Sequence, residues 1–182
     1  MKKKNIFVNV ISWIAITSFI CIISIADASS QSWRSDYDFV GKFYENLAKA
    51  KLEDKWGFVD KEGEIVIPFE YDDVRDFKNG AARIKLNNKF GFVDKTGKKI
   101  VPVEYDDAFD FKEDLARVKK NNKFGFVNKT GKVVISLKYD FANDFSGGIA
   151  RVRLKDDEIY IDKDGDEVEM EEEEYYEDYE EY

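Results

Sequence analysis

The side chains in this sequence that are best suited to chemistry are aspartates that recur at a fixed spacing. Two carboxylates on either side of a glycosidic bond can work as an acid and a base, or as an acid and a nucleophile, so repeated aspartates could hydrolyse sugars. They form two series with the same constant step, which are Asp72, Asp106 and Asp140, and Asp76, Asp110 and Asp144. A group placed identically in every copy of a repeat serves the repeat, so we expect these carboxylates to cap turns or to pair with the equally periodic Arg83, Arg117 and Arg151.

Other groups that carry chemistry in proteins are scarce. The chain has no His and a single Cys, Cys21, which excludes the usual nucleophilic triads, Cys/His metal sites and an intrachain disulfide. The best metal candidates are the acids Asp162, Asp164 and Asp166, because several oxygens in a short loop suit Ca²⁺. Gly165 is not where an EF-hand loop needs its glycine, however, and the stretch aligns with an ordinary turn of the repeat. The sequence therefore predicts no catalytic residue, no cofactor and no dedicated metal site.

The elements that must position these acids belong to a repeat. Residues 55–63 return as residues 89–97 and again as residues 123–131, and a fixed period of this length predicts stacked structural units. The signature positions of the unit are Trp56-Gly57, Phe90-Gly91 and Phe124-Gly125, followed by Tyr71, Tyr105 and Tyr139. The step from Phe90 to Phe124 defines one period. We expect the leading aromatics of the signature to form the core between units, with an exposed stacking ladder for a sugar or peptide as the alternative.

One unit reads as three short strands. Residues 82–86 alternate between apolar and polar side chains, Asn87-Asn88 suits a two-residue hairpin turn, and residues 89–94 form the second strand. Thr96-Gly97 makes the next turn, and the third strand is expected to end at Pro102. The connector to the next unit, with apolar residues three apart, suits one helical turn or a tight loop.

The fold predicted from these units is all-β, a tandem array of three-stranded antiparallel meanders. An open, twisted array is expected. The alternative is a closed four-bladed, propeller-like ring, because residues 36–171 equal four periods.

The two ends of the chain differ from the array, which spans residues 36–165. Residues 1–28 read as a signal peptide, with Lys2, Lys3 and Lys4, an apolar run and an Ala26-Asp27-Ala28 cleavage site. An uncleaved N-terminal membrane anchor is the alternative, because the apolar run is close to a bilayer span. In either case the body is expected outside the cytoplasmic membrane, in the periplasm, secreted or on the cell surface. Residues 29–35 are expected to be a linker.

The charge of the chain is concentrated in its C-terminal tail. The formal net charge is −9; residues 1–28 contribute +2, and residues 166–182 hold eleven acids and no base, so residues 29–165 are neutral. A neutral body with an acidic tail argues against a nucleic-acid partner. Like charges and few apolar residues predict a mostly disordered tail. Its tyrosines could dock on a basic partner, or the tail could simply aid solubility; they are Tyr175, Tyr176, Tyr179 and Tyr182.

The repeated residues resemble the bacterial WG-repeat (KWG) family. The resemblance rests on the pattern Trp/Phe-Gly-Phe-Val-Asp/Asn-Lys-x-Gly and on the later Tyr-Asp-x-Val/Ala-x-Asp-Phe, and it covers about residues 36–170. The signature Trp stands only at Trp56, with Phe at the two later positions. The resemblance implies a β-rich repeat fold and a scaffold role, with no active site to transfer. The function expected is a non-enzymatic exported scaffold for a protein or an envelope polymer; the alternative is a cell-envelope hydrolase, or an accessory subunit of one, that uses the repeated carboxylates.

Overall fold

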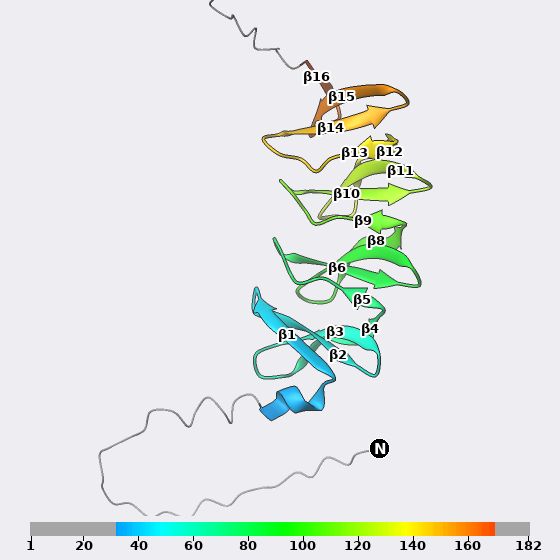
Figure 1. Ribbon diagram of the computed structural model, residues 1–182. Coiled ribbons are helices and arrows are strands. Elements are labelled where there is room, and N and C mark those ends of the chain that lie inside the picture. Colours follow the sequence, from blue (N-terminus) through cyan, green and yellow to red (C-terminus); the bar gives the residue numbers. More distant parts are fainter. Residues whose placement is uncertain (1–31, 170–182) are drawn as a thin grey trace, which may run out of the picture.

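The computed structural model describes residues 32–169, which form four antiparallel sheets stacked along one axis (Figure 1). Each sheet has four strands in chain order. The first sheet contains β1 (Phe39–Tyr44), β2 (Leu47–Leu52), β3 (Lys55–Val59) and β4 (Ile65–Tyr71). The second contains β5 (Asp73–Val74), β6 (Ala81–Leu86), β7 (Lys89–Asp94) and β8 (Lys99–Tyr105). The third contains β9 (Asp107–Ala108), β10 (Leu115–Lys120), β11 (Lys123–Asn128) and β12 (Val133–Tyr139). The fourth contains β13 (Phe141–Ala142), β14 (Ile149–Leu154), β15 (Asp157–Asp162) and β16 (Glu167–Val168).

The central hairpin of each sheet follows from its turn residues. Asn87 and Asn88 have φ values of 51° and 61°, which is the backbone of a two-residue turn whose twist matches the flanking strands. Leu86 therefore pairs with Lys89 across the turn, as the sequence predicts. The all-β fold and its tandem units are confirmed.

The connector between units differs from the expectation of a helical turn or a tight loop. Two of its residues form a short additional strand, β5, which precedes the three predicted strands of the next unit. Asp73 pairs with Lys85 and Val74 with Ile84 on β6. The unit is thus a four-stranded meander, one short strand longer than predicted.

The third predicted strand does not end at its proline. β8 runs from Lys99 to Tyr105 and passes through Pro102 at a bulge. Phe90 pairs with Tyr105 and Phe92 with Val101, so the pairing shifts register between these two positions. A bulge tolerates the missing N–H of proline, which is why the strand continues.

The core is built from rings and small residues at equivalent positions. The largest fully buried side chains are tyrosines and phenylalanines that recur at equivalent positions of the first three sheets, namely Tyr71, Tyr105, Tyr139, Phe58, Phe92 and Phe126. The leading aromatics of the signature, which were expected in the core, are only partly buried: Trp56, Phe90 and Phe124. The buried aromatic is thus the one that follows the signature glycine.

Neighbouring sheets are joined by pairs of aromatic rings. Phe58 on β3 packs on Phe77, which follows β5, with ring centroids 4.8 Å apart. The same contact recurs between the second and third sheets, as Phe92–Phe111, and between the third and fourth, as Phe126–Phe145. We call each of these meeting places of two consecutive sheets a joint.

The N-terminal end of the stack is covered by a short helix. Residues 32–35 of the predicted linker belong to the 3₁₀ helix η1 (Ser32–Asp36). Trp33 on this helix packs on Phe43 at 6.4 Å and on Tyr37 at 6.1 Å. The helix therefore gives Phe43 the aromatic partner that a preceding sheet would otherwise supply.

The stack is open, because the first and fourth sheets lie at its opposite ends (Figure 1). The prediction of an open array is therefore correct, and propeller-like closure is not observed. At the C-terminal end, β16 extends the array to Val168, beyond the predicted boundary at residue 165. The proposed signal segment, residues 1–28, lies outside the described residues. Within residues 32–169 no helix is long and apolar enough to cross a membrane.

Candidate functional site

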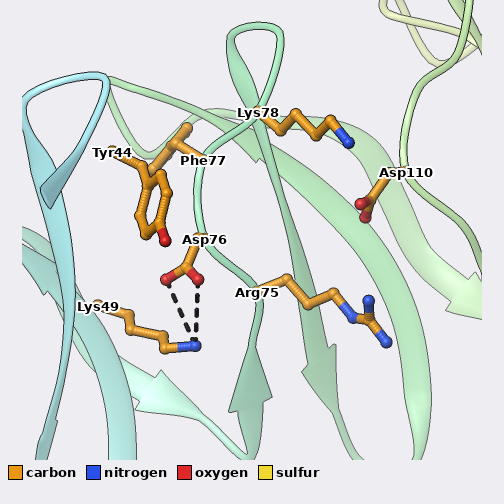
Figure 2. A pocket seen from close by; sticks show the side chains of 7 residues that line it. All are labelled: Tyr44, Lys49, Arg75, Asp76, Phe77, Lys78 and Asp110. Atoms are coloured by element: carbon orange, nitrogen blue, oxygen red, sulfur yellow. Dashed lines mark hydrogen bonds and ion pairs between the residues drawn. The ribbon is translucent and has the colours of Figure 1, made fainter. Parts of the chain in front are cut away.

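A groove of about 530 Å³ lies between the first and second sheets and extends toward the third (Figure 2). Its lining side chains are Tyr44, Lys49, Arg75, Asp76, Phe77, Lys78 and Asp110. A second hollow of about 220 Å³ shares Arg75, Lys78 and Asp110 and adds residues from the next joint, which are Arg83, Phe109, Lys112 and Asp144. The two hollows share a wall, so together they follow the joints along one side of the stack.

The loop that carries Arg75 and Lys78 is held at several points. The amide N of Arg75 donates to the carbonyl of Arg83 at 2.9 Å. Lys78 and Ala81 form an antiparallel bridge, and the nearby ring of Phe77 is buried against Phe58. The backbone of this groove wall is therefore fixed by the same contacts that join the sheets, while the two cationic side chains are exposed.

Two of the periodic aspartates that line the groove, Asp76 and Asp144, form ion pairs. Lys49 Nζ lies 3.3 Å from Asp76 Oδ1, which joins the first sheet to the second. At the last joint Arg117 Nε lies 3.1 Å from Asp144 Oδ1. Each of these two carboxylates neutralises a base of the preceding sheet.

The middle joint breaks this pattern. Arg83 Nη1 donates to the carbonyl of Ala108 at 2.7 Å, as Arg117 Nη1 does to the carbonyl of Ala142, but its ion pair is with Asp107, whose Oδ1 lies 3.9 Å away. Within residues 32–169, Asp110 has no basic partner within 4.0 Å, and Figure 2 shows its carboxylate facing the groove without a dashed contact. The periodic acids thus differ from joint to joint.

The groove is more basic than the chain as a whole. Its lining carries five bases and three acids, on a protein whose net charge is −9. Three of the bases have no acidic partner within 4.0 Å in the described part of the chain: Arg75, Lys78 and Lys112. Exposed bases without partners attract an anion from solution.

The other aspartate series stabilises hairpin turns. The carboxylate Oδ2 of Asp72 accepts from the amide N of Asn87 at 2.7 Å, and Oδ1 accepts from Lys55 Nζ of the preceding sheet at 2.6 Å. Asp106 and Asp140 make the equivalent contacts one and two units later. Each carboxylate therefore fixes a turn and links two sheets, which leaves it poorly placed for catalysis.

The same contacts predict how stability depends on pH. Lys89 and the Asn121 amide, both hydrogen-bonded to Asp106, hold the pKa of that carboxyl below its ordinary 3.8, and the pKa values of Asp72 and Asp140 are shifted the same way. A carboxyl whose pKa is lower in the folded state stabilises the fold above its unfolded pKa and loses that contribution as pH falls through the folded pKa. We expect the urea midpoint to be steady from pH 7 to about pH 5 and to fall below about pH 4.

Asp106→Asn should give a shallower fall in the urea midpoint, because the amide cannot titrate. A midpoint that is flat or rising between pH 5 and pH 3 in the unmodified chain would contradict this assignment.

The metal candidates lie in an ordinary turn of the repeat. Asp162 Oδ1 accepts from the amide N of Asp164, Gly165 and Asp166, each at 3.0 Å. The equivalent turn at Asp94 has a similar arrangement. Among the described residues no group of three potential ligands is close enough together to hold a metal ion.

None of the partly buried signature aromatics lines the groove: Trp56 packs on Phe39, with ring centroids 5.6 Å apart, and the other two lie beside basic side chains. Phe90 has the Arg83 guanidinium carbon 4.9 Å and Lys85 Nζ 5.3 Å from its ring centroid. Phe124 is flanked in the same way by Arg117 and Lys119. The tail tyrosines, Tyr175, Tyr176, Tyr179 and Tyr182, lie outside the described residues.

Sequence reasoning missed the cationic side chains of the groove because it followed what repeats. Arg75 is replaced by Phe109 and then Asn143 at successive periods, and Tyr44, Lys78, Lys112 and Ser146 share another variable position. The variable positions of an otherwise regular connector are the signal that could have found the groove.

One comparison with known proteins finds a match. A family model described as WG containing repeat matches residues 36–56, 56–90, 90–124 and 124–157. These four consecutive segments cover the greater part of the chain and run along the four stacked units. No curated protein matches the sequence.

Proposed function

The chain belongs to the family of WG-repeat proteins, and from its groove we propose a non-enzymatic scaffold that binds an extended anionic partner. The observation that carries the proposal is the row of bases along the joints of the stack that have no acidic partner within residues 32–169, namely Arg75, Lys78 and Lys112. The partner is a protein segment or an envelope polymer that carries carboxylates or phosphates.

The dimensions and side chains of the groove suit a chain-like partner. Arg75 and Lys78 lie on the loop between β5 and β6, and Lys112 lies on the equivalent loop of the next sheet, so a repeating anion can meet bases at two successive levels of the stack. Tyr44 and Phe109 line the two hollows and offer ring faces beside the charges. Several weak contacts on one rigid surface add up when the partner is itself multivalent.

A binding role fits the carboxylates better than hydrolysis does. Asp76 and Asp144 are ion-paired, and Asp72, Asp106 and Asp140 are hydrogen-bonded to turns. A glycosidase needs one acid with a raised pKa beside a second, ionised one, whereas Asp72, Asp106 and Asp140 have lowered pKa values. The proposed location is outside the cytoplasmic membrane, because the N-terminal sequence has the composition of an export signal.

The test compares two double variants with the same change in charge. Arg75→Gln/Lys78→Gln removes two unpartnered bases from the groove, and Lys61→Gln/Lys132→Gln removes two exposed bases outside it. Binding of the full-length chain to labelled polyglutamate and to anionic polymer from a bacterial envelope is measured at low and moderate salt.

We expect the groove variant to bind about tenfold more weakly, because it loses two ionic contacts; tenfold in affinity corresponds to about 1.4 kcal/mol. Its affinity should also depend less on salt, because fewer ionic contacts remain to be screened. The control should bind like the unmodified chain. Equal weakening in both variants would show that binding depends only on the net charge of the protein, and would contradict a specific groove.

A further inference from the structure

Each joint of the stack is made by contacts at fixed chain separations. A ring on the third strand of one sheet packs on a later ring, always at the same separation, in the pairs Phe58–Phe77, Phe92–Phe111 and Phe126–Phe145. At two joints a base on the second strand pairs with the aspartate just before that later ring, as Lys49–Asp76 and Arg117–Asp144. The second half of a joint is therefore recognisable in sequence as an Asp-aromatic pair at these separations.

The fourth sheet holds the first half of such a joint, but residues 32–169 do not supply the second half. Tyr160 is equivalent to Phe126, yet it is 36% exposed, whereas Phe126 is 0% exposed. The Arg151 side chain is 41% exposed, against 14% for its equivalent Arg117. Arg151 pairs within its own hairpin, at 3.3 Å from Glu158 Oε2. The C-terminal end of the stack is thus an open joint.

The opposite end shows that a terminal sheet of this protein can be capped by a flanking segment of the chain. Trp33 packs on Phe43, the ring that a preceding sheet would cover. Trp33 also occupies the space beside Gly63, where an added Cβ would lie 2.4 Å from the indole. The array therefore has a cap at its beginning that its end does not have within the described residues.

The sequence beyond the fourth sheet has the missing half in register. One period after residues 140–145, which follow β12 and complete the last joint, come residues 174–179. Asp178 falls on Asp144 and Tyr179 on Phe145. Asp178 therefore follows Arg151 at the separation of Arg117–Asp144, and Tyr179 follows Tyr160 at the separation of Phe126–Phe145.

We propose that residues 174–179 of the chain's own acidic tail cover the open C-terminal joint. Tyr179 packs on Tyr160, and the Asp178 carboxylate pairs with Arg151. A tyrosine suits this place because the outermost ring has one side in water, where its hydroxyl stays hydrated. Residues 169–173 provide the same length of chain as residues 135–139, which form β12 after its first two residues, one unit earlier.

Several departures from the repeat make this cover weaker than an internal joint, and the buried Ile135 and Tyr139 correspond to Glu169 and Glu173. Lys55, Lys89 and Lys123 hold the aspartate that begins each connector, but their equivalent in the fourth sheet is Asp157. The residue that takes the place of that aspartate is Glu174, and like charges repel. The cover therefore rests on Asp178 and Tyr179, so it opens more readily than the joints below it.

Hydrogen exchange read by mass spectrometry on the full-length chain tests the proposal. Tyr179→Ala and Asp178→Ala are compared with Tyr182→Ala, which alters a tail tyrosine that has no counterpart in a joint. We expect amides of β14 and β15 to exchange at least about threefold faster in the first two variants, because local opening governs exchange. Exchange in β6 and β7 should be unchanged, and Tyr179→Phe should keep the protection.

Two results would overturn the proposal. Exchange of β14 and β15 that is the same in Tyr179→Ala, Asp178→Ala and the unmodified chain would show that the tail leaves the joint open. Protection that grows with protein concentration would show that the tail of a second copy covers it. Polyglutamate binding by the Arg75/Lys78 groove is a separate measurement, so either proposal can fail alone.

Discussion

Replacing Phe92 by alanine is expected to lower the free energy of unfolding by about 3–5 kcal/mol. The ring is 1% exposed and packs on Phe111 at 4.8 Å, so its removal leaves a cavity in the joint between the second and third sheets. The loss is measured by urea unfolding followed by circular dichroism.

Phe90→Ala is the matched control, on the same strand and just before the signature glycine. Its ring is partly buried beside Arg83 and Lys85, so alanine there should cost about 1–2 kcal/mol. Equal losses in the two variants would contradict the assignment of the core to the ring after the signature glycine.

Replacing Gly91 by alanine is expected to cost about 2–4 kcal/mol, because the new methyl group has no room. A Cβ built there lies 2.7 Å from the carbonyl oxygen of Val101 and 2.8 Å from that of Pro102, both backbone atoms of the bulged β8. The bulge would have to move, together with the pairing of Phe92 and Val101.

Gly80→Ala separates this close approach from backbone strain. Gly80 has a φ of 80°, but a Cβ there meets nothing within 4 Å, so alanine should cost only about 1 kcal/mol. Thermal unfolding of the two variants measures the difference. A Gly80 variant that loses as much as the Gly91 variant would show that the close approach at the signature adds nothing to the ordinary cost of replacing a glycine.

The repeat, its strands and its central turn could be predicted because they depend on neighbours in sequence. Asn87-Asn88 sets the turn, the turn sets the register of β6 and β7, and the constant period carries the result to the other units. The short β5 could not be predicted, because Asp73 and Val74 become a strand only through pairing with β6. The bulge at Pro102 likewise depends on how β8 crosses Gly91.

The site was harder to predict because it is formed between units. The periodic arginines and aspartates suggested pairing, but the partner of Arg117 is Asp144, which belongs to the following sheet. Arg83 pairs with Asp107, which is outside both periodic series. The basic character of the groove is hidden in a chain whose net charge is −9. Only stacking brings Arg75 and Lys112 to the same side of adjacent joints.

The role of the groove is tested most directly by placing a photo-crosslinking residue in it. The group replaces Tyr44 in one full-length chain, and Val133, which is exposed on β12 outside the groove, in a control chain. Both are irradiated in envelope extract, with and without Arg75→Gln/Lys78→Gln. The scaffold account predicts an anionic partner captured from position 44, lost with the two bases, and absent at position 133. Equal capture at both positions, or capture that persists without the two bases, would contradict it.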